Sequence, residues 1–185
     1  MFLFEPCWAA SFTWTGGGSD ANWSTTGNWS GGVAPANDGT ATVVLSGTTQ
    51  LAPNVDVAWD INSLTFSNNA GALVLGGAAL TIRGGGITNN NTNSQTINNA
   101  ITLGAGETWN ASSGNLNVDG IINNGGSLLT VSGSFNTLIS GVISGAGGLT
   151  RTGTGTNILS GANTYSGVTT ISAGVLNIQN SSALG

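Results

Sequence analysis

Charge is scarce in this 185-residue chain, and positive charge is almost absent. Charged residues make up 5% of the sequence, which has two arginines, no lysine, no histidine and a formal net charge of −5. Nucleic-acid binding depends on clustered Lys and Arg side chains that neutralise phosphates. Arg83 and Arg151 lie far apart in the sequence. We therefore expect no nucleic-acid partner.

The side chains that usually transfer protons are also missing. General acid–base catalysis relies mostly on His, and a Ser nucleophile needs an adjacent base such as His or Lys. Asp56 and Asp60 are the closest acids in the repetitive part of the chain, but the Val-Ala-Trp segment between them indicates a strand, not a catalytic carboxylate pair. We therefore expect no enzyme, no catalytic residue and no cofactor.

Cysteine and long apolar runs are scarce as well. Cys7 is the single cysteine, so the chain forms neither an internal disulfide nor a thiolate metal cluster. The GGGSD segment at 16–20 is similar to a calcium-binding repeat but occurs once, so no metal site is expected. No apolar run reaches 18 residues, so no membrane-spanning segment is expected. This composition is typical of a secreted bacterial protein.

Glycine, asparagine, serine and threonine dominate what is present, interrupted by short apolar runs. Gly and Asn adopt positive φ cheaply and favour tight corners, while alternating β-branched residues favour strands. Segments of about 20 residues repeat this plan, which is a solenoid period. They are 101–120, 121–141 and 142–161. Stacked coils would place Ile101, Ile121 and Val142 in one inward row, and the pairs 98–99 and 123–124 in an Asn ladder at a corner.

The last stretch, residues 149–185, has the clearest pattern. TNILSG, VTTIS and VLNIQN each predict a strand, with Gly- and Asn-rich corners between them. The motifs GANTYSG and TTISAG resemble the autotransporter-associated β-strand repeat, or passenger-associated transport repeat. Asn157 and Val168 depart from the usual pattern at single positions. The resemblance implies a secreted, single-stranded right-handed parallel β-helix, usually part of a longer surface-displayed passenger.

The N-terminal part differs in character. Residues 1–12 are apolar but lack a basic region, which leaves two interpretations: a signal remnant or an apolar N-terminal strand. Residues 13–39 carry Trp14, Trp23 and Trp29 among Gly, Ser and Asn, and resemble the head segment that often precedes these repeats. We expect a cap over the first coil of a solenoid spanning 40–185, because a solenoid end must be covered. The alternative is a tryptophan platform that binds carbohydrate.

Two functions are compatible with these features of the sequence. The chain is expected to be either the structural shaft of a secreted or cell-surface protein, or an adhesin that binds surface carbohydrate through its Trp-rich head or a Thr/Asn face. Thr150, Thr152, Thr154 and Thr156 stand at strand spacing, but earlier segments lack a matching pair, so no repeated threonine plane is predicted. The open C-terminal coil predicts either further coils or head-to-tail self-assembly into fibres. The assembly residues would be Phe2, Phe4, Val175, Leu176 and Ile178.

Overall fold

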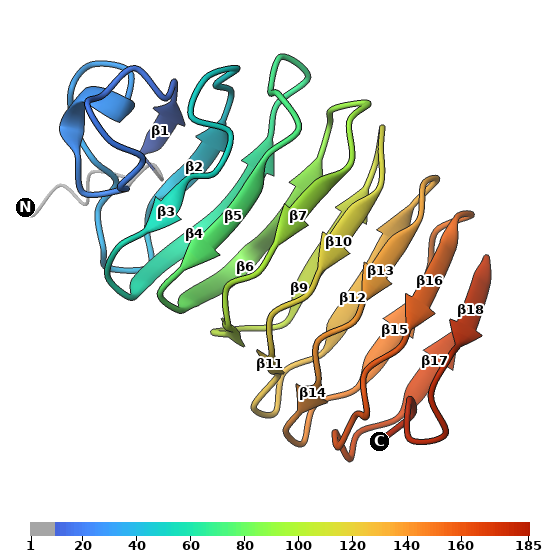
Figure 1. The fold of residues 1–185 in the computed structure, drawn as a ribbon. Helices are drawn as coiled ribbons and strands as arrows, with labels where there is room; N and C mark the ends of the chain where they lie inside the picture. Colours follow the sequence, from blue (N-terminus) through green and yellow to red (C-terminus); the bar gives the residue numbers. More distant parts are fainter. Residues whose placement is uncertain (1–9) are drawn as a thin grey trace, which may run out of the picture.

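The structure, a computed structural model, describes residues 10–185. The chain winds into a stack of coils whose strands pair in parallel with the coils before and after (Figure 1). One sheet runs through β1 (Ser11–Trp14), β2 (Thr42–Leu45), β4 (Trp59–Phe66), β6 (Leu80–Asn89), β9 (Glu107–Ala111), β12 (Leu129–Gly133), β15 (Leu149–Arg151) and β17 (Thr169–Ile171). A branch of this sheet contains β8 (Ile101–Leu103), β11 (Ile122–Asn123) and β14 (Ile143–Ser144).

The second sheet covers the opposite side of the coils. It contains β3 (Asn54–Val55), β5 (Val74–Gly77), β7 (Gln95–Ile97), β10 (Leu116–Val118), β13 (Thr137–Ile139), β16 (Thr156–Leu159) and β18 (Val175–Ile178). Within residues 10–185 the only helix is the 3-10 turn η1 (Thr26–Asn28). The predicted all-β parallel solenoid, with strands stacked in sequence order, is therefore confirmed.

The coil changes shape at β6. Its first residues pair with β8 and its last residues pair with β9, so one long strand is followed by two shorter strands joined by a corner. A register shift between β4 and β6 occurs at the glycine run 84–86, where Gly86 has a φ of +64°. The next three coils each have three strands, and the last coil has two, β17 and β18. The sequence signal for the change is the Arg-Gly-Gly-Gly segment.

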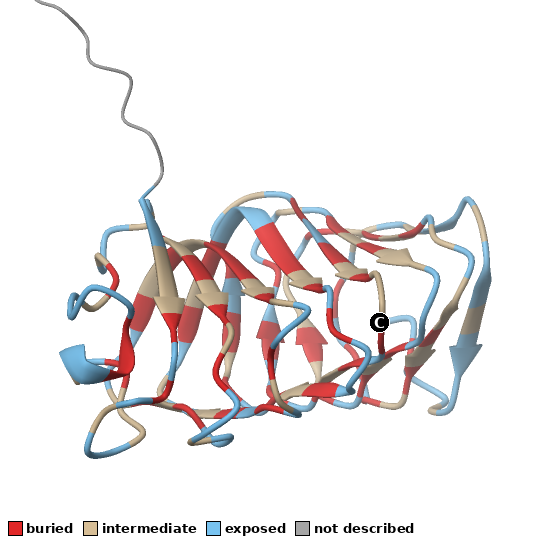
Figure 2. Ribbon diagram, turned by 90° about the horizontal axis from the view of Figure 1, so that it is seen from above, coloured by how far each residue is buried: buried red, intermediate tan, exposed pale blue. Residues whose placement is uncertain are grey.

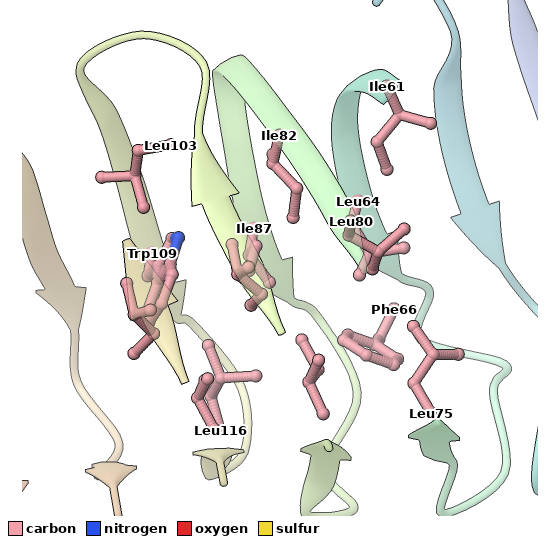
Figure 3. Packing of buried hydrophobic residues seen from close by; sticks show 14 of the residues in the cluster. Ile61, Leu64, Phe66, Leu75, Leu80, Ile82, Ile87, Leu103, Trp109 and Leu116 are labelled. Carbon is pink, nitrogen blue, oxygen red and sulfur yellow. The ribbon is translucent and has the colours of Figure 1, made fainter. Parts of the chain in front are cut away.

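The core consists of inward side chains stacked in columns along the solenoid axis. Figure 2 shows buried residues alternating along the strands mainly with residues of intermediate exposure, and Figure 3 shows aliphatic and aromatic side chains of successive coils packed beside one another. One column passes through the first sheet and is given by the strand register: Val43, Leu64, Ile87, Trp109, Val131, Arg151 and Ile171. Each member covers the one before it, so burial depends on the neighbouring coil.

The predicted inward row of Ile101, Ile121 and Val142 is wrong by one residue. Ile122 and Ile143 pair with Ile101 and are buried, whereas Ile121 is 65% exposed. The peptide N–H of Ile101 donates to the carbonyl of Ile121, which holds this register. Because side chains alternate with a period of two, a slip of one residue exchanges the inward and outward faces.

The predicted asparagine ladder is also wrong. Asn99 and Asn124 are buried, but their amides bond backbone groups of adjacent coils and not one another. The Nδ2 of Asn124 donates to the carbonyl of Gly147 at 2.9 Å, and the N–H of Gly147 donates back to Oδ1. Side-chain amides therefore satisfy corner backbone groups that no strand partner reaches.

Candidate functional site: the two ends and the outer face

The N-terminal end is closed by a cluster of four tryptophans. Trp14, Trp23, Trp29 and Trp59 make three edge-to-face contacts, with ring centroids 5.3 to 5.8 Å apart. The first three are at most 2% exposed. The Nε1 of Trp29 donates to the carbonyl of Trp23 at 2.6 Å. These rings leave no exposed face on which a sugar could stack.

Backbone segments of the Trp-rich region also occupy the free edges of the first strands. The N–H of Thr15 and the carbonyl of Thr13, at β1, bond Asn28 and Ser30 in antiparallel fashion. On the other sheet the N–H of Trp23 donates to the carbonyl of Asn54 at 2.9 Å. The first strand of each sheet therefore has a partner beyond it, and this arrangement reduces edge-to-edge pairing.

The C-terminal end differs, because the core columns end there on exposed side chains. Leu176 and Ile178 of β18 follow Asn157 and Leu159 inward, and Ile171 of β17 follows Arg151. Ile171 is 55% and Ile178 is 50% exposed, and within residues 10–185 the outer edges of β17 and β18 have no partner strand. This end offers both an apolar surface and unpaired backbone groups.

The structure sorts the predicted assembly residues into three groups. Leu176 and Ile178 lie at the open end of the core, as their strand pattern indicated. Val175 is also exposed, but its register partner Thr156 faces outward, so Val175 belongs to the side of the solenoid. Phe2 and Phe4 lie outside the described residues. Ile171 was missed, because its place at the end of a column depends on the register of β15 and β17.

A row of threonines follows the outer face of the first sheet. Thr108, Thr130, Thr150 and Thr170 pair in register in four successive coils. Beside them runs a second outward row through Thr65, Thr88, Asn110 and Ser132. Neighbouring strands of a sheet are about 4.8 Å apart, so the hydroxyl groups form a regular array. Thr108 and Thr130 are single threonines in register with Thr150, and the next outward positions in their coils are Asn110 and Ser132. The expectation that segments 101–120 and 121–141 lack a matching threonine pair therefore agrees with the register, and residues 152–155 form a corner.

A shallow hollow of about 310 Å³ lies on this face. Its lining residues are Gly84, Gly106, Glu107, Thr108, Leu128 and Thr130. Glu107 is 4% exposed, and its Oε1 accepts a hydrogen bond from Trp109 Nε1 at 2.5 Å. Burial raises the pKa of Glu107 to about 8, although the bond from Trp109 opposes the shift. The carboxyl group is therefore mostly protonated at neutral pH.

Aspartates near the N-terminal end hold loops together. Thr25 Oγ1 and the N–H of Asn22 donate to Asp20, and the Thr25 bond is the main reason that the pKa of Asp20 is lowered. Burial raises the pKa of Asp56, but hydrogen bonds from Ser24 outweigh it and leave the pKa below its ordinary value. Asp60 forms a bidentate ion pair with Arg83, with a shortest distance of 2.6 Å. Across residues 10–185 no group of three potential metal ligands occurs.

The repeat motif near the C-terminus has clear structural roles. Asn163 of GANTYSG accepts a bond from the N–H of Ile143 and donates to the carbonyl of Ala183, linking three coils. The Tyr165 hydroxyl lies 2.6 Å from Thr169 Oγ1 and is buried. A Cβ at Gly167 would collide with the backbone of Gly147. The motif therefore fixes how one coil stacks on the next.

These features define a parallel β-solenoid with four tryptophans packed together near its first coil. Residues 149–178 match the family model described as Passenger-associated-transport-repeat, which confirms the resemblance for this segment. This repeat belongs to autotransporter passenger domains, which are secreted or displayed at the cell surface. Comparison with curated proteins and with solved structures gave no match. Over the described part of the chain, no helix has the length and apolar character needed to cross a membrane.

Proposed function

We propose that the chain is a structural shaft segment of a secreted or surface-displayed bacterial passenger. The observation that carries this proposal is the open C-terminal coil, whose core columns end on Ile171, Leu176 and Ile178. A surface of this kind is suited to the stacking of another coil. The passenger-associated transport repeat at 149–178 supports the same role. The proposal includes no catalytic activity and no cofactor.

Two partners would complete that surface: further coils of a longer chain, or a second copy stacked head to tail into a fibre. The fibre requires the N-terminal segment of one copy to add to β17 and β18 of the next. Residues 28–30 already occupy part of the β1 edge, so the added strand would come from the residues that precede β1 and not from β1 itself.

Light scattering and electron microscopy of the purified chain test the fibre. We expect assembly that is lost on deleting residues 1–9, which leaves β1 intact, and in the double variant Ile171→Lys/Ile178→Lys. Ile121→Lys is the control, because Ile121 is more exposed than Ile171 and Ile178 but lies on the side of a coil. If the chain were a monomer at high micromolar concentration, both with and without its N-terminal segment, the fibre would be ruled out and further coils of a longer chain would be favoured.

A second candidate function is carbohydrate binding by the outer face of the first sheet. The in-register hydroxyl rows and the adjacent hollow favour it, since neutral sugars are recognised by polar groups in a concave site. We expect oligosaccharide binding, measured by a glycan array and calorimetry, to be lost in Thr108→Val/Thr130→Val. Thr96→Val on the other sheet is the control. Equal binding by both variants would rule this face out.

The buried tryptophans give a separate test of the Trp-rich head. Trp23→Ala removes a fully buried ring, so we expect a loss of stability with little change in any sugar binding that the fold retains. If a stably folded Trp23→Ala variant selectively lost sugar binding, the carbohydrate site would instead lie in the Trp-rich head, residues 13–39.

A further inference from the structure

Three buried polar side chains face the interior near the C-terminal end. Arg151 is 1% exposed, and Thr137 and Asn157 are fully buried. Five of their polar atoms have no hydrogen-bonding partner in the protein: Nε and Nη1 of Arg151, Nδ2 and Oδ1 of Asn157, and Oγ1 of Thr137. Buried polar atoms are nearly always paired, so a group of five calls for a physical explanation.

The hydrogen bonds of Arg151 place its guanidinium group at the inner side of a corner. Nη2 donates to the carbonyls of Gly133 at 3.1 Å and Gly155 at 2.6 Å. Gly155 lies in the corner between β15 and β16, and Asn157 points inward two residues later. Thr137 is the register partner of Asn157 in the preceding coil. Arg151 and Asn157 therefore flank one corner from its two sides, and Thr137 lies beside Asn157 in the preceding coil.

The charge of Arg151 has no counter-charge nearby. Among residues 10–185 the only ion pair is the one between Arg83 and Asp60, on the surface. Burial lowers the pKa of Arg151, but a guanidinium group keeps its proton at any physiological pH. Carbonyl oxygens stabilise the N–H groups without neutralising the charge. A buried charge normally requires a partner of opposite sign.

We propose that this corner binds a small monovalent inorganic anion, with chloride as the natural ligand. Four of the five unpaired atoms carry hydrogens to donate, namely Arg151 Nε and Nη1, Asn157 Nδ2 and Thr137 Oγ1. Such a set suits a ligand that only accepts hydrogen bonds, and a water molecule would leave the charge uncompensated. Ile171 and Leu176 of the next coil stack over Arg151 and Asn157, so the anion would be enclosed.

Chloride-dependent stability tests the site. Thermal unfolding is measured in sodium chloride and in sodium gluconate at constant ionic strength, because gluconate is too large to enter. Above the dissociation constant, a tenfold rise in chloride should raise the folding equilibrium constant about tenfold. Arg151→Met should abolish this dependence. Arg83→Met, which removes the other arginine, should retain it.

A direct measurement keeps the proposal testable if Arg151→Met does not fold. Crystals grown with bromide in place of chloride should show an anomalous peak beside the Arg151 guanidinium, and Asn157→Leu should weaken both the peak and the chloride dependence. The proposal is overturned if the thermal unfolding midpoint of the wild type does not change with chloride concentration, or if the midpoint of Arg151→Met changes by the same amount. It is also overturned if the crystals show bromide only at adventitious lattice sites and water in the corner.

Discussion

Glu107 is the residue through which we expect solution pH to act on stability. Its neighbours in the same inward column, Leu129 and Leu149, are apolar, and its pKa is raised from 4.5 to about 8. Between these values the unfolded chain loses the proton while the folded chain keeps it. The folded state then binds more protons, so the free energy of unfolding falls as pH rises through this window.

The predicted fall is roughly 3 kcal/mol between pH 5 and pH 8, since each unit of pKa difference corresponds to about 1.4 kcal/mol. Glu107→Gln should remove the slope and be more stable than wild type at pH 8, because its amide oxygen still accepts the bond from Trp109. Urea unfolding at a series of pH values measures this. If the free energy of unfolding of Glu107→Gln fell with pH as steeply as that of the wild type, the group that titrates in this window would not be Glu107.

At this scale the sequence indicated the tryptophans but not the buried polar residues. Trp14, Trp23 and Trp29 precede the first coil, and burial was expected there because a solenoid end must be covered. Arg151 and Glu107 have ionisable side chains that a simple alternation of polar and apolar residues would not single out as interior. Asn157 was noted as a departure from the repeat pattern, and the structure gives that departure a polar interior neighbourhood.

At the scale of elements, a column of corner glycines determines how closely coils approach. Gly120, Gly141 and Gly161 stack at equivalent corners, and a Cβ on any of them would lie within 3.0 Å of a carbonyl oxygen of the preceding coil. These corners therefore require glycine for close approach and not for a positive φ. The strands on either side of such a corner pair with the preceding coil at the distance that this close backbone approach allows.

Gly141→Ala should therefore lower the free energy of unfolding by about 2–4 kcal/mol, since backbone and not a flexible side chain must move. Gly126→Ala is the matched control, because no atom lies within 4 Å of the added Cβ, and its effect should stay within about 0.5 kcal/mol. Urea midpoints of the two variants give the comparison. Equal midpoints would show that the coils can separate at the corner without cost.

The strand pattern predicted the C-terminal strands well. It did not determine the register of the coils in the middle of the chain. TNILSG, VTTIS and VLNIQN correspond to β16, β17 and β18, because Gly and Asn bound each run. The error at Ile121 arose where two apolar residues, Ile121 and Ile122, are adjacent and the alternation permits either face. Two further features depend on pairing between coils, which a single sequence does not display. One is the pairing of β6 with two strands of the next coil, β8 and β9, and the other is the outward threonine row.

At the scale of the whole molecule, the two ends of the solenoid should differ in stability. β1 is paired with β2 on one side and with residues 28–30 on the other, and four tryptophans pack there. Among residues 10–185, β17 and β18 each have one neighbouring strand. Stability in a solenoid is approximately a sum of repeat and nearest-neighbour terms, so a coil with one neighbour opens first.

We therefore predict that the purified 185-residue chain unfolds from its C-terminal coil. Amides of 169–178 should exchange hydrogen at least about tenfold faster than those of β9 and β12, and should lose protection at urea concentrations that leave tryptophan fluorescence unchanged. Asn163→Ala, which cuts bonds to Ile143 and Ala183, should speed exchange in the last coil without altering the N-terminal half. If every protected amide instead exchanged with the same free energy, the solenoid would unfold as one cooperative unit, and the open end would impose no local weakness.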